Sequence, residues 1–77
     1  MKTEDPWVNL VKGILRSEMT RRQVTYDQLA ERLKAIGVDD TPVNLRNKVA
    51  RGGFSAAFFV QCLRAVGATK LDIGADE

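Results

Sequence analysis

The sequence contains no histidine and only one cysteine among its 77 residues. Histidine is the commonest general base and metal ligand of proteins, so its absence removes the usual starting point for catalysis or metal binding. Cys62 lies in an apolar stretch, where a free cysteine packs as a small core residue, and it has no intramolecular disulfide partner. We therefore expect no enzyme activity, no cofactor and no metal ion, and no small-molecule substrate is evident.

Long apolar runs are also missing. The longest runs over five residues, from Ala56 to Val60, whereas a membrane-spanning helix needs about 20. The first ten residues carry acids and a proline where a signal peptide has a basic stretch followed by an apolar run. We expect a cytoplasmic protein that does not interact with membranes.

The length predicts one domain, over residues 1–77. An apolar content of 44% and a charged content of 29% are ordinary for a globular protein. A domain this small buries only about 60% of the surface of its unfolded chain, which favours association of two copies. We therefore expect a homodimer.

Capping residues and apolar spacings predict four helices. The chain has two prolines, Pro6 and Pro42, and each follows a capping residue at the first position of an expected helix. Gln28 completes a capping box with the threonine three residues before it. The expected N-caps are Asp5, Thr25, Thr41 and Ser55, and the expected helices span about residues 6–22, 26–36, 42–51 and 56–66.

The fold class that follows is all-α, a compact four-helix domain with a short extended tail over residues 68–77. Leu71 and Ile73 alternate with polar residues in this tail, which indicates one short strand. A single strand needs a partner, such as the same strand of a second copy.

Positive charge is concentrated in the second half of the chain. Residues 1–40 carry seven Lys or Arg and seven Asp or Glu, whereas residues 41–70 carry five Lys or Arg and no acid. The net charge of the whole chain is only +2. Local clustering, however, decides whether a polyanion is attracted.

The expected helix over residues 42–51 has a single narrow apolar pair, Leu45 and Val49. At about 100° per residue, two asparagines and an arginine lie opposite this pair, with an arginine and a lysine on the flanks. Asn pairs with adenine and Arg with guanine in the major groove, while flanking cations and the first amides of a helix hold phosphates. The candidate DNA-binding residues are Asn44, Arg46, Asn47, Lys48 and Arg51.

Three segments carry a family resemblance: TYDQLAERL, NLRNKVARG and FSAAFFVQCLRAVG. Together they resemble the helix-turn-helix domain of the Cro and C1 repressor type over about residues 24–67. The resemblance implies that Leu29 and Ala30 belong to the scaffold helix and that Asn44, Asn47, Lys48 and Arg51 occupy recognition-helix positions. The connection between the two helices is longer here than in that family. The whole chain also resembles a family of short bacterial proteins of unknown function, through NLRN, RGxFSAAFF and QCL.

Two functions compete on this basis. The first is a small transcriptional regulator that reads duplex DNA with the third helix, as a dimer on half-sites about 34 Å apart. The alternative is a protein interaction module of helix-turn-helix shape without DNA binding, favoured by Trp7, Val60 and residues 71–73. Each of these features also has a structural interpretation, since Trp7 would be the first core residue of its helix and the tail would fold back on that helix.

Overall fold

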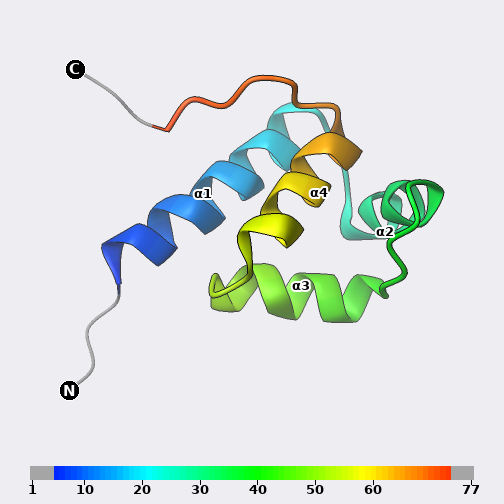
Figure 1. Ribbon diagram of the computed structural model, residues 1–77, viewed down its shortest axis with the longest axis horizontal. Coiled ribbons are helices and arrows are strands. Elements are labelled where there is room, and N and C mark those ends of the chain that lie inside the picture. Colours follow the sequence, from blue (N-terminus) through cyan, green and yellow to red (C-terminus); the bar gives the residue numbers. More distant parts are fainter. Residues whose placement is uncertain (1–4, 74–77) are drawn as a thin grey trace.

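Each helix begins at a side chain that accepts a hydrogen bond from a backbone amide of its first turn. The computed structural model describes residues 5–73, with α1 (Pro6–Arg21), α2 (Tyr26–Ala35), α3 (Pro42–Arg51) and α4 (Ala56–Val66) shown in Figure 1. The predicted N-caps Asp5, Thr25, Thr41 and Ser55 are all confirmed. Replacing such a cap by alanine costs about 1 kcal/mol, so these residues define the helix starts.

Left-handed backbone conformations end the first two helices. Gly37 has φ +89°, and the Val38 amide donates to the Leu33 carbonyl at 2.8 Å, which is the predicted Schellman ending of α2. α1 ends in the same way, because the Val24 amide donates to the Met19 carbonyl at 2.8 Å. α1 and α2 each end one residue before the expected limit, since residues 22 and 36 are the C-caps.

Gln23 holds the left-handed position after α1 with φ +58°, and no other non-glycine residue of the described chain has a positive φ. The variant Gln23→Gly is expected to raise the free energy of unfolding by about 0.5–1 kcal/mol, because relief of Cβ strain exceeds the extra entropy of glycine in the unfolded chain. Urea denaturation measures this change. Gln23→Ala keeps the strain and is the control, so equal stability of the two variants would contradict the prediction.

The four helices enclose one apolar core. α1 contacts α3 and α4, and α2 contacts the same two helices. In Figure 1, α3 runs along one edge of the molecule, with α1 and α4 side by side above it and α2 beyond its first turn. The fully buried side chains come from all four helices: Leu15, Leu29, Leu33, Leu45, Val49 and Cys62. No described residue forms a β-strand, so the all-α fold is confirmed, and none of the described helices has the length and apolar character needed to span a membrane.

Two sequence-based expectations at the ends of the chain are wrong. Residues 69–73 form no strand, because they run back past α1 on the side away from α3 without a second extended segment beside them. The rest of the expected tail, residues 74–77, lies outside the described residues. Trp7 is not a core residue, since its side chain is 72% exposed. The first turn of α1 extends past the other helices in Figure 1, so none of these helices covers Trp7.

Candidate nucleic-acid interface

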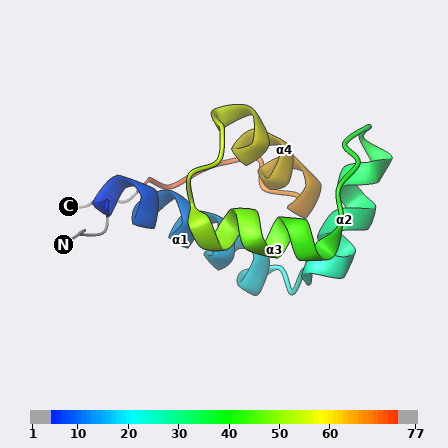
Figure 2. The same cartoon turned by 90° about the horizontal axis from the view of Figure 1, so that it is seen from below.

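α3 presents its polar face at the surface of the molecule. In Figure 2 this helix lies in front of α1 and α4 along its whole length. Leu45 and Val49 are completely buried beneath it, whereas Val43 on the opposite face is 60% exposed. The polar face of α3 is therefore open to a partner from its first turn to its last.

Three of the five predicted DNA-binding residues lie on this surface without a hydrogen bond or ion pair to the rest of the described chain. They are Arg46, Asn47 and Arg51, and all three are exposed. Asn47 and Arg51 are four residues apart, so their side chains project from one face of α3 on successive turns. Both are positioned to meet the same partner.

The other two predicted residues hold the turn before α3. The Lys48 ammonium lies 2.6 Å from a carboxylate oxygen of Asp40 and 5.1 Å from the centre of the Phe58 ring. The Asn44 side chain also helps to lower the pKa of the Asp40 carboxyl. Asp40 is almost buried, with 8% of its side chain exposed, so its charge requires these partners. No sequence pattern indicates this role, because the contact joins residues eight positions apart.

The ion pair between Lys48 and Asp40 makes stability depend on pH. The Lys48 ammonium, which donates to the Asp40 carboxylate, holds the pKa of that carboxyl below its ordinary value of 3.8. The stability that Asp40 contributes is therefore present above this value and is lost as the pH falls through the lower pKa of the folded state.

The variant Asp40→Asn is expected to lose about 1 kcal/mol of unfolding free energy at pH 7 and to lose less at pH 3. Thermal unfolding at the two pH values measures the difference. Asp39→Asn is the matched control, because the Asp39 side chain is exposed and is expected to change stability little. Equal losses in the two variants at pH 7 would contradict this role of Asp40.

Two contacts with α1 fix the position of the last turn of α3. The Lys12 ammonium donates to the Ala50 carbonyl at 2.9 Å, which satisfies a carbonyl at the helix end. Gly52 follows with φ +75°, and a Cβ at this position would lie 2.5 Å from Cγ1 of Val8. α3 and α1 therefore approach each other more closely at Gly52 than any residue with a side chain permits.

Arg46 connects α3 to the first turn of α2. Its guanidinium lies over the Tyr26 ring, 5.4 Å from the ring centre. Stacking on an aromatic ring restrains the guanidinium and leaves its N–H donors available. The Arg46 side chain would therefore lose little further conformational entropy on binding an anion.

Neither a metal-binding cluster nor an exposed thiol occurs in the described part of the chain. Among residues 5–73, no three Cys, Asp or Glu side chains lie close enough together to hold a metal ion. Cys62 is completely buried, and this burial raises the pKa of its thiol to about 12. At neutral pH the thiol is protonated and packs as an apolar group, as predicted.

Comparison with known proteins identifies a family. Residues 7–71 match the family described as Domain of unknown function (DUF6471), which agrees with the predicted resemblance to a family of unknown function. No curated protein and no solved structure matches the chain. Because the match covers far more than half of the sequence, the chain belongs to the DUF6471 family.

Proposed function

We propose that this protein binds duplex DNA by placing α3 in the major groove. The observation that carries the proposal is the exposed polar face of α3, where Arg46, Asn47 and Arg51 have no hydrogen-bonding or ionic partner in the described chain. The predicted resemblance to the Cro and C1 repressor type supports the same role for α3. A protein with this function would belong to the class of small transcriptional regulators.

The chemistry of α3 suits a groove about 12 Å wide. In this proposal the Asn47 amide and the Arg51 guanidinium contact base edges, and Arg46 contacts a phosphate. Lys48 contributes indirectly, because its ion pair with Asp40 balances a carboxylate that would otherwise repel the DNA backbone. Asn44 supports the same turn.

The experiment that tests the proposal is retention of random duplex DNA on the purified protein at about 50 mM and about 200 mM salt, followed by sequencing of the retained fraction. Several phosphate contacts would lower the affinity by roughly a hundredfold or more over this range, through counterion release. An enriched motif supports specific reading, and a palindromic motif supports a dimer. Absence of retention at the lower salt concentration would contradict DNA binding.

The second candidate function is a protein interaction module. Three large apolar side chains support it, because they remain in solvent: Trp7 is 72% exposed, Ile73 68% and Val60 55%. Exposed apolar side chains of this size favour protein contacts when they lie close together. A mass of twice 8.6 kDa in sedimentation, together with no DNA retention, would favour this function over the first.

A further inference from the structure

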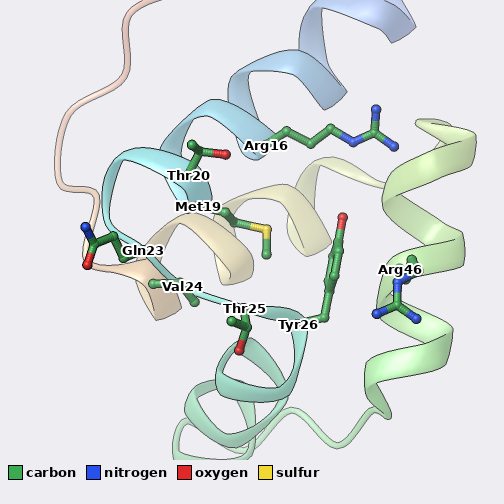
Figure 3. Close-up of a pocket in the computed structure, with 8 residues that line it drawn as sticks. All are labelled: Arg16, Met19, Thr20, Gln23, Val24, Thr25, Tyr26 and Arg46. Carbon is green, nitrogen blue, oxygen red and sulfur yellow. The ribbon is translucent and has the colours of Figure 1, made fainter.

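A pocket of about 600 Å³ lies between the end of α1, the start of α2 and the middle of α3. We refer to it as the Tyr26 pocket, after the aromatic residue that lines it (Figure 3). Its volume falls within the range of roughly 300–1,000 Å³ that small-molecule sites occupy. Neither the DNA-binding proposal nor the apolar core accounts for this space.

The base of the Tyr26 pocket is apolar. Met19 and Val24 form part of it and are almost fully buried, with 6% and 5% of their surfaces exposed. The Tyr26 ring stands beside them, half-buried. An aromatic or aliphatic group would lose its contact with water here and would stack on the tyrosine ring.

Two arginines flank the opening from different helices. Figure 3 shows the Arg16 side chain extending from α1 and the Arg46 side chain on α3, with the Tyr26 ring between them. Neither guanidinium forms an ion pair within residues 5–73, and no acidic residue lines the pocket. The opening is therefore positively charged, and a guanidinium binds a carboxylate through two parallel hydrogen bonds.

We propose that the Tyr26 pocket binds a small organic anion that has an aromatic or apolar body and one carboxylate. The body occupies the space beside Met19, Val24 and Tyr26, and the carboxylate lies at the opening, where Arg16 and Arg46 supply the positive charge. A second consequence rests on the proposed function: because Arg46 also faces the DNA in that proposal, the bound anion lowers the affinity for DNA. The pocket then acts as an effector site of a regulator.

The test uses the full chain without DNA and indole-3-acetate as the probe. Titration followed by amide NMR is expected to show saturable shifts at Val24 and Tyr26. Tryptamine, which has the same ring and a positive charge, is expected not to bind. Arg16→Gln is expected to weaken the binding of indole-3-acetate by about tenfold, the effect of one charge-assisted hydrogen bond. Arg64→Gln removes an exposed arginine that does not line the pocket and serves as the matched control.

The outcomes separate this inference from the proposed function. Equal binding of indole-3-acetate and tryptamine, an unchanged affinity in Arg16→Gln, or no saturable shift in the pocket would overturn the effector site. Arg51→Gln lies outside the pocket, so it is expected to weaken DNA binding and to leave the binding of indole-3-acetate unchanged. Saturable binding by a chain that retains no DNA supports the pocket and refutes the DNA-binding proposal.

Discussion

Replacing Asn47 and Arg51 together by alanine is expected to abolish detectable DNA binding and to leave the fold unchanged. Each side chain that reads a base contributes about 1–3 kcal/mol, so the double variant loses about 2–6 kcal/mol, or roughly thirtyfold to twenty-five-thousandfold in affinity. Both residues are exposed, and neither belongs to the core. Fluorescence anisotropy with the motif selected from the random pool measures the loss.

Two controls accompany this double variant. Its thermal midpoint is expected to match that of the original chain, which shows that lost binding does not reflect unfolding. Arg64→Ala removes one positive charge from α4, outside the α3 surface, and is expected to change the affinity only slightly. If the double variant binds the same DNA as tightly as the original chain, α3 does not read the bases and the recognition face has been assigned incorrectly.

Gly52→Ala is expected to cause a large loss of stability, about 2–5 kcal/mol. One part of the cost is the positive φ of +75°, which is worth about 1–2 kcal/mol for a residue with a Cβ. The other part is steric, because the new Cβ would lie 2.5 Å from Cγ1 of Val8 and 3.3 Å from the Val8 carbonyl oxygen. Relief of this overlap requires α1 and α3 to separate, at a typical cost of about 1–3 kcal/mol.

Two other glycines provide matched controls for Gly52→Ala. A Cβ on Gly37 meets no atom within 4 Å, although φ is +89°, so Gly37→Ala measures the backbone strain alone. A Cβ on Gly53 meets no atom and has no such strain, so Gly53→Ala is expected to be nearly neutral. The expected order of stability loss in urea denaturation is Gly52→Ala, then Gly37→Ala, then Gly53→Ala. Equal losses for Gly52→Ala and Gly37→Ala would show that α1 and α3 do not meet closely at this point.

Local interactions explain why so much of the helical framework was predictable. The Thr25 hydroxyl accepts from the Gln28 amide at 3.1 Å, and the Gln28 side chain accepts from the Thr25 amide at 2.9 Å. These partners are three residues apart, so the sequence pattern identifies both at once. The burial of Leu45 and Val49 could be predicted in the same way, because a short helix with one narrow apolar pair buries the face that carries this pair.

The candidate interface was predicted as a set of residues but not as a set of roles. The sequence places five polar side chains around α3 and treats Lys48 as a phosphate contact. Only the structure brings Asp40 beside Lys48 at 2.6 Å, and their separation of eight positions spans the turn before α3 and two turns of helix. Helical periodicity does not predict the contact between Asp40 and Lys48, because the path of the turn before α3 depends on how the helices pack in the rest of the protein.

By itself the sequence determined the helix starts, the left-handed ending at Gly37 and the outward face of α3, because these features depend on bonds within a few residues and on helical periodicity. Only the tertiary structure decided that Trp7 stays in solvent, that Gly52 lies against Val8 and that Arg46 stacks on Tyr26. These features depend on how far one helix extends past another. That distance follows from the packing of the whole core, to which every helix contributes.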